Sequence, residues 1–171
     1  LSVGGVVSVV GRTGFRFDRV KESNGDEAVA WRNTPVVEIK DELQEAYDKI
    51  AEELNIPVLK MHYIPEGMKF DTLIFENQRA FIIFSYRGHS IWLAEVGDVP
   101  VADNIHVSDR EYFDDEYNRR LGETVYFSRN RLENGDIEYS AEIMKMEAYY
   151  YISGIMEEED LRSIVQQMYF D

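Results

Sequence analysis

The fold of this chain is set by residues 56–96, IPVLKMHYIPEGMKFDTLIFENQRAFIIFSYRGHSIWLAEV, in which three apolar runs are separated by short polar connections. The runs span residues 69–76, 80–86 and 90–96, and Pro65-Glu66-Gly67 turns the chain before the first of them. A parallel crossover needs a dozen or more residues, so connections this short force neighbouring strands to run antiparallel. The stretch therefore predicts the start of an antiparallel sheet, preceded by a short strand at residues 58–63.

One of these runs, residues 80–86, is apolar on both of its faces. Phe81, Ile82, Ile83 and Phe84 follow one another directly, so odd and even positions alike carry large apolar side chains. Strands that read as continuous apolar runs are typical of sheets that are buried on two faces. We therefore expect this strand to be central in the sheet and covered on both sides.

The sequence further downstream predicts more strands and one long acidic loop. Residues 124–132 and 137–146 flank Asn134-Gly135, which is a strong signal for a hairpin turn. In the second of these strands apolar and polar residues alternate, which predicts one dry face and one wet face. Residues 149–154 form a last strand. Residues 97–122 are rich in Asp and Glu without a regular pattern, so we expect an irregular loop there.

Two helices are predicted from apolar residues at helical spacing. In residues 38–54 the spacing is carried by Ile39, Leu43, Tyr47, Ile50 and Leu54. Near the C-terminus it is carried by Leu161, Ile164, Val165 and Met168, after an acidic first turn that suits the positive end of the helix dipole. The predicted fold class is therefore α+β: an antiparallel meander sheet of about six strands, covered by two main helices at about residues 38–54 and 157–169.

Composition and charge exclude several classes of protein. A chain of 171 residues with 44% hydrophobic residues can bury a core, which excludes bulk disorder. Its formal net charge is −15, and this field repels a phosphate backbone, so nucleic acid is excluded as an expected partner. The chain has no cysteine, which excludes disulfides, thiol catalysis and thiolate metal sites.

The first ten residues, LSVGGVVSVV, are apolar and allow two interpretations. They are too few to span a bilayer, which needs about 20 apolar residues, but they fit either the outer end of a membrane anchor or a valine-rich strand. Basic residues follow at positions 12, 16, 19 and 21, and such a flank usually marks the cytoplasmic side of a span. We divide the chain into an N-terminal segment, residues 1–34, with a possible anchor end followed by a juxtamembrane strand and a turn, and a single α+β extracytoplasmic domain, residues 35–171.

No catalytic or metal-binding signature is present in the sequence. His62, His89 and His106 do not form a zinc-binding pattern, and there is no nucleophile elbow or glycine-rich phosphate loop. We therefore predict no catalytic residue, no cofactor and no metal. The acidic stretch offers oxygens of the kind that Ca²⁺ prefers, but it lacks the central Gly of the twelve-residue calcium loop. A run of solvated charges is the better interpretation.

Three short motifs carry a resemblance to a known family. They are Tyr63-Ile64-Pro65-Glu66-Gly67, Asp114-Asp115-Glu116-Tyr117-Asn118, and Tyr151-Ile152-Ser153-Gly154 with the later Glu159-Asp160-Leu161 and Ile164-Val165. On these motifs, residues 56–170 resemble the domain-of-unknown-function family four-three-six-seven of Gram-positive bacteria, although residues 144–147 carry no tryptophan where that family is expected to have one. The resemblance implies a membrane-tethered extracytoplasmic domain, similar to the C-terminal regions of anti-sigma factors and to the folds of lipoprotein carriers. It implies no catalytic residue.

Three classes of function remain as hypotheses. The leading one is a non-enzymatic sensing or interaction domain outside a cell membrane, held by a single span, that binds a protein partner or peptide and takes part in sigma-factor regulation. Its candidate interaction surface comprises Asp109, Glu111, Asp114, Asp115, Glu116, Tyr149 and Tyr151. The second is a carrier of a lipid or apolar ligand, with a pocket lined by Phe81, Phe84, Trp92 and Tyr126. The third is an enzyme that uses carboxylates of residues 98–116, which requires two of them in one cleft with perturbed pKa values.

Overall fold

The computed structural model describes residues 15–21, 27–33, 38–98 and 110–171, and side chains from residue 42 onward outside the gap at 99–109. The chain divides into two compact units, Leu1–Glu45 and Ala46–Asp171. In the first unit, β1 (Phe15–Lys21) pairs antiparallel with β2 (Glu27–Asn33), a strand that the sequence did not indicate. The predicted anchor or strand at residues 1–10 lies outside the described residues. None of the described helices is long and apolar enough to cross a membrane.

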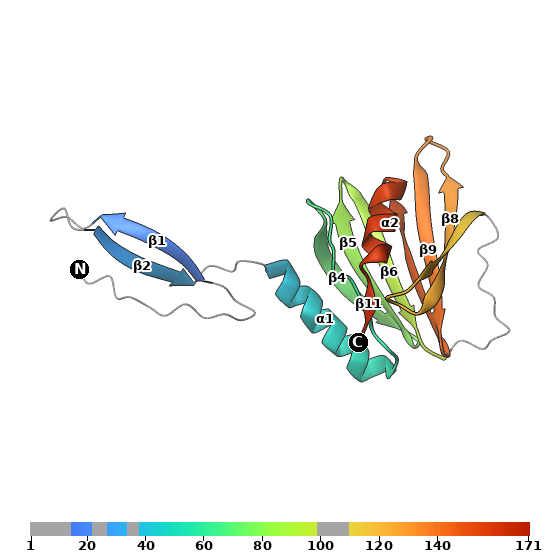
Figure 1. Ribbon diagram of the computed structural model, residues 1–171, viewed down its shortest axis with the longest axis horizontal. Helices are drawn as coiled ribbons and strands as arrows, with labels where there is room; N and C mark the ends of the chain where they lie inside the picture. The colour runs from blue at the N-terminus through green and yellow to red at the C-terminus, as the bar shows by residue number, and fades with distance from the viewer. Residues whose placement is uncertain (1–14, 22–26, 34–37, 99–109) are drawn as a thin grey trace. The chain divides into compact units, whose positions relative to one another are not determined.

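The second unit contains a seven-stranded antiparallel sheet in the order β4-β5-β6-β10-β9-β8-β7 (Figure 1). Its strands are β4 (Lys69–Glu76), β5 (Arg79–Tyr86), β6 (His89–Val96), β7 (Glu111–Asn118), β8 (Glu123–Arg131), β9 (Ile137–Lys145) and β10 (Ala148–Ile155). Two helices, α1 (Glu38–Leu54) and α2 (Glu158–Gln166), accompany it, and β3 (Leu59–Lys60) pairs with β11 (Tyr169–Phe170) as a separate two-stranded sheet. The prediction of an antiparallel sheet with two helices is confirmed.

The sheet has seven strands, so the predicted number of six is wrong. The strand that was missed is β7, which forms inside the acidic stretch that was expected to be an irregular loop. The sheet is also not a single meander, because its strand order combines two of them. A first meander, β4-β5-β6, and a second, β7-β8-β9-β10, join where β6 pairs with β10, with Trp92 opposite Ser153.

The turns between the first strands use residues with positive φ. Asn77 and Gln78, at 45° and 63°, join β4 to β5, and Arg87 and Gly88, at 49° and 79°, join β5 to β6. Two successive positive φ angles define the type I′ turn, whose twist matches that of the strands on either side. These turns confirm the predicted hairpins and fix the register of β4 on β5, in which Glu76 lies opposite Arg79.

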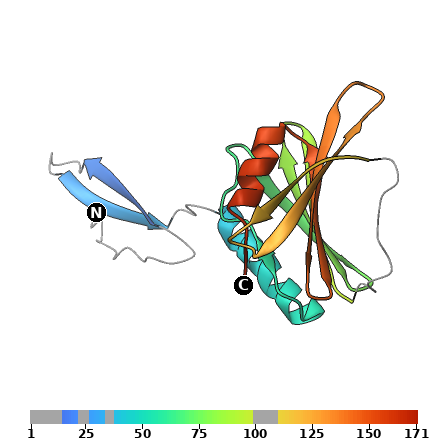
Figure 2. The ribbon, with the colours of Figure 1, turned by 45° about the vertical axis from the view of Figure 1, so that its right-hand side comes forward.

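The core lies on one face of the sheet. Alternate side chains of the strands point to this face and are buried: Ala80, Ile82, Phe84, Ile91, Leu93, Val125, Phe127, Ala141, Ile143, Tyr150 and Ile152. Figure 1 and Figure 2 show α2 and the second half of α1 lying on the same side of the sheet. Of the predicted helical stripes, all four residues of the second and Leu43, Tyr47, Ile50 and Leu54 of the first are buried. We call this side the helix face and the opposite side the open face.

The strand β5 is not central, contrary to the prediction from its apolar sequence. It lies second from the edge, between β4 and β6. Ile82 and Phe84 are fully buried on the helix face, whereas Phe81 is half-buried on the other side. The apolar residues on both faces of β5 reflect a packed core on one side and an aromatic surface on the other.

The helix α2 ends at Gln166, earlier than predicted, because the chain then returns to the sheet margin as β11. Side chains from the end of β7 and from the turn after it cap the C-terminal end of α2. The side-chain amide of Asn118 donates to the carbonyl of Val165 at 2.9 Å, and Arg120 donates to that of Gln167 at 3.2 Å. Carbonyls of the last turn have no partner within a helix, so these bonds tie α2 to the second meander.

Candidate functional site

The open face carries large aromatic side chains that neither helix covers. Trp92 on β6 is 41% exposed and Tyr126 on β8 is 45% exposed. The alternation of side chains along each strand places them there, because Leu93 and Phe127, their neighbours in sequence, point into the core. Aromatic residues held on a rigid sheet are costly to leave in water, so this face is the first place to look for a binding site.

A hollow of about 320 Å³ lies on the open face. The hollow is lined by residues of β5, β6, β9 and β10 and by the residue just before β7. The lining residues include Phe81, Trp92, Glu138, Tyr151, Ser153 and Arg110. His89, at the start of β6, also lines it. Ligand sites in proteins typically begin at about 300 Å³ and combine aromatic walls with a few fixed polar groups. The hollow has both.

The polar part of the hollow is a fixed ion pair. The guanidinium of Arg110 donates to Ser153 Oγ at 3.1 Å, forms an ion pair with Glu138 and lies 4.9 Å from the centre of the Tyr151 ring. Ser153 Oγ in turn donates to Glu138 Oε1 at 2.9 Å. Both charged side chains keep some exposure, 14% for Arg110 and 26% for Glu138. A donor and an acceptor are therefore held in place and remain reachable from solvent.

The aromatic part of the hollow is built from edge-to-face and stacked rings. Phe81 and Trp92 meet at 6.0 Å with an interplanar angle of 76°, and Tyr151, which also lines the hollow, is stacked at 6.5 Å by Tyr149, which lies beside it. Such pairs stabilise one another beyond the area that they bury. Burial, together with the neighbouring carboxylate of Glu142, raises the pKa of the Tyr149 phenol. The rings thus form a neutral, preorganised wall.

A row of three serines crosses the middle of the open face. Ser128 on β8 lies opposite Ser140 on β9, and Ser140 lies opposite Ser153 on β10. The hydroxyls of Ser140 and Ser153 are 3.4 Å apart, and the buried Ser128 hydroxyl has no hydrogen-bond partner. Because the serine side chains are small, they project less from the sheet than the flanking rings and the Arg110–Glu138 pair do.

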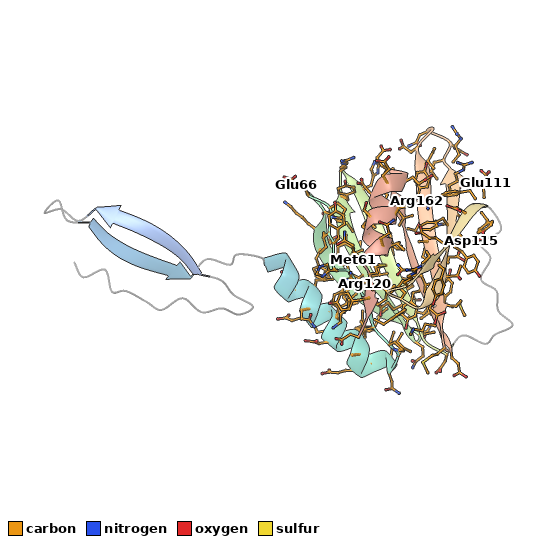
Figure 3. All side chains as sticks on the ribbon, viewed as in Figure 1. Met61, Glu66, Glu111, Asp115, Arg120 and Arg162 are labelled. Atoms are coloured by element: carbon orange, nitrogen blue, oxygen red, sulfur yellow. The ribbon has the colours of Figure 1, made fainter. Side chains whose placement is uncertain are left out.

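The predicted acidic surface does not form one site with the tyrosines. Glu111 pairs with Arg129 of β8 at 3.0 Å, and Asp114 pairs with Arg162 of α2 at 2.6 Å. Figure 3 labels Glu111 and Arg162. These arginines hold the pKa of both carboxyls below the usual values. Glu116 approaches the same Arg162 at 3.7 Å. The three carboxylates therefore form ion pairs that hold β7 against β8 and α2.

The remaining predicted residues lie elsewhere. Asp115 accepts a hydrogen bond from the hydroxyl of Tyr112, which raises the pKa of that phenol to about 12. Tyr149 and Tyr151 lie on the open face of β10, and only Tyr151 lines the hollow. Asp109 lies outside the described residues. Across the part of the chain that the structure describes, no group of three or more His, Asp and Glu side chains is arranged to hold a metal ion.

The four residues predicted to line a carrier pocket are divided between the two faces. Phe81 and Trp92 line the hollow on the open face. Phe84 is fully buried in the core on the helix face. Tyr126 is on β8, two strands away from β10, the strand that carries Tyr151. These residues therefore do not enclose one apolar cavity.

Among the side chains that the structure describes, one carboxyl is buried in the core beneath the helix face. Glu95 on β6 is fully buried, and neither of its carboxylate oxygens has a hydrogen-bond partner. Burial raises its pKa well above the usual range, and the nearby Leu59 main chain and Lys60 ammonium offset this only in part. Lys60 is itself held by an ion pair with Asp171 at the end of the chain. Burial therefore favours the neutral form of the Glu95 carboxyl.

Comparisons with family models, with curated proteins and with solved structures find no significant match to this chain.

The sequence pointed to part of the hollow but not to its polar centre. The alternation in β9 placed Glu138 on a wet face, and Trp92 was named as a ligand-binding residue. Arg110 and Ser153 gave no signal, because their role depends on a contact between chain segments more than 40 residues apart, which bring Arg110 over β10.

Proposed function

We propose that this domain is a non-enzymatic binding module, whose ligand site is the hollow on the open face. The occupant that we propose is an extended segment of a protein partner. An apolar or aromatic side chain of the segment packs against Trp92 and Phe81, and its main-chain polar groups pair with Arg110 and Glu138. The observation that carries the proposal is the exposed Trp92 beside a fixed Arg–Glu pair in one hollow.

The residue types support binding rather than chemistry. Trp, Tyr and Arg are the residues that most often dominate the energy of protein interfaces, and all three line this hollow. The Arg110–Glu138 pair offers hydrogen-bond donors and an acceptor already ordered by Ser153, so a ligand does not have to order them on binding. Two carboxylates on β7, Glu111 and Asp114, are paired with arginines and have lowered pKa values, which suits a structural ion pair more than proton transfer.

Loss of the Trp92 side chain should remove the binding site without unfolding the sheet. Peptides selected from a random display library on the wild-type domain are expected to bind Trp92→Ala at least about 30-fold more weakly, the effect of an interface hot spot of about 2 kcal/mol. For the domain with Trp92 intact, each synthetic peptide is titrated into the Trp31→Phe variant, and its affinity is measured from the fluorescence of Trp92, which is then the single tryptophan of the chain. Isothermal calorimetry gives the affinity of the Trp92→Ala variant.

The matched control is Met146→Ala, at an 81% exposed apolar side chain in the turn between β9 and β10. It removes a similar exposed apolar group outside the hollow and is expected to leave the affinity unchanged. Peptides that bind Trp92→Ala as tightly as the wild-type domain, or a library that yields no binder, would contradict the proposed function.

We further propose that the domain works on the outer side of a cell membrane, tethered through its N-terminal segment. The support is the family resemblance and the apolar opening at residues 1–10. Because the chain has no cysteine, Met146→Cys introduces a unique and exposed thiol. In intact cells that make the full gene product, a membrane-impermeant maleimide is expected to label this thiol. Labelling that appears only after the cells are lysed would place the domain inside and refute the proposed location.

A further inference from the structure

The two edges of the seven-stranded sheet differ in how they are protected. The outer strand β7 carries Asp114, Asp115 and Glu116 and a register shift after Tyr112, and charges and bulges of this kind prevent an edge from pairing with another strand. The opposite edge strand, β4, also has a register shift, between Phe70 and Thr72, and charged residues towards both ends, but its stretch Thr-Leu-Ile-Phe at residues 72–75 has no charge. Within the described residues no strand pairs with its outer side.

The same stretch of β4 exposes two large apolar side chains on opposite faces. Ile74, opposite Phe81, points to the open face and is 42% exposed. Phe75, opposite Ala80, points to the helix face and is 40% exposed. An uncharged stretch of an edge strand with exposed apolar residues on both faces is a template for a further strand.

The turn between β4 and β5 determines which main-chain groups of β4 point outward. In a two-residue hairpin the residues that flank the turn, here Glu76 and Arg79, form a hydrogen-bonded pair, and such pairs alternate along the ladder. Glu76, Ile74 and Thr72 therefore direct their N–H and C=O groups to β5. Leu73 and Phe75 direct theirs outward, where an added strand can bond to them.

We propose that β4 pairs antiparallel with β4 of a second copy of this chain, about a two-fold axis at Ile74. In this register Ile74 lies opposite Ile74 of the second copy, and Leu73 lies opposite Phe75 of the second copy. The outward main-chain groups of Leu73 and Phe75 meet their counterparts and form four hydrogen bonds. This surface is separate from the hollow, so the proposal goes beyond the binding function.

The other two registers that match outward groups fit less well. An axis at Leu73 places Phe75 opposite the charged Asp71, at the position where the register of β4 shifts. An axis at Phe75 places Leu73 opposite Asn77, which belongs to the turn. The axis at Ile74 alone pairs apolar with apolar side chains on both faces, and Thr72 then lies opposite Glu76 of the second copy.

The test uses engineered cysteines, because the natural chain has none. Ile74 of one copy and Ile74 of the other form a non-hydrogen-bonded pair, whose Cα atoms lie about 4.5 Å apart, within the range that a disulfide spans. Under mild oxidation, Ile74→Cys is expected to become mostly a covalent dimer. Met146→Cys, which is more exposed, is expected to remain mostly monomeric at the same protein concentration.

The register is tested by two further variants. Thr72→Cys alone and Glu76→Cys alone are expected to form little dimer, whereas a mixture of the two is expected to form a disulfide-linked heterodimer. Sedimentation of the wild-type chain is expected to show a dimer that Ile74→Lys converts to monomer. A monomeric wild-type chain, equal oxidation of Ile74→Cys and Met146→Cys, or a mixture that does not cross-link would each overturn the proposal.

Discussion

A chain that carries Leu161→Asp is expected to lose its cooperative unfolding transition. Leu161 is fully buried where α2 packs on the helix face, beside Ile164 and Val165. Removing a buried Leu side chain costs about 2–5 kcal/mol, and burying an unpaired carboxylate in its place adds several more. A domain has a net stability of only about 5–15 kcal/mol, so the substitution removes most or all of it. Thermal unfolding followed by circular dichroism measures the effect.

The control for this prediction is Gln166→Asp, which introduces the same carboxylate at an exposed position near the end of the same helix. It is expected to cost less than about 1 kcal/mol, because a negative charge near a helix C-terminus is only mildly unfavourable. A sigmoidal melt for Leu161→Asp, with a midpoint close to that of Gln166→Asp, would show that α2 is not part of the cooperative unit.

The sequence identified the elements whose signals are local. Helical spacing of apolar residues gave both helices, because only one face of each is buried and the pattern repeats every three or four residues. Short turns gave the hairpins, because Gly135 and Gly88 accept positive φ at little cost. These features depend on neighbours within one element, so no knowledge of the rest of the fold is needed to find them.

The strand β7 was missed because its stabilising partners are distant in sequence. Its residues read as a run of solvated charge, yet Glu111 pairs with Arg129, and Asp114 with Arg162. Phe113 lies in contact with Phe127 and with the guanidinium of Arg129. An edge strand with polar side chains on both faces lacks the period-two pattern of a half-buried strand, so hydrophobicity alone cannot reveal it.

The polar centre of the hollow was missed for a related reason. Trp92, Glu138 and Arg110 lie on three separate elements and meet because β6 pairs with β10 in a register that places Trp92 opposite Ser153. That pairing joins the two meanders across a long connection. Sequence patterns indicate which residues share a face of one strand, but they do not indicate which strands become neighbours.

Glu95→Gln is expected to make the domain less sensitive to pH and more stable at neutral pH. Burial raises the pKa of Glu95 well above its ordinary value of 4.5. Above that ordinary value the unfolded chain loses this proton while the folded chain keeps it, so the free energy of unfolding falls as pH rises. The fall is about 1.4 kcal/mol per pH unit until the raised pKa of the folded state is reached. The contribution of the protonated Glu95 to the free energy of unfolding is therefore fully present in acid and is lost toward alkaline pH.

Urea unfolding of the wild-type and Glu95→Gln chains between about pH 5 and about pH 8 measures this difference. The excess stability of Glu95→Gln over the wild-type chain is expected to grow with pH, because the amide side chain does not titrate in this range. Glu133→Gln removes the same formal charge at an exposed turn and controls for the change in net charge. All other titrating groups are common to the compared chains, so their contributions cancel. Parallel stability curves for wild type and Glu95→Gln would mean that the core holds an ionised carboxylate, for which Lys60 would then have to be the counter-ion.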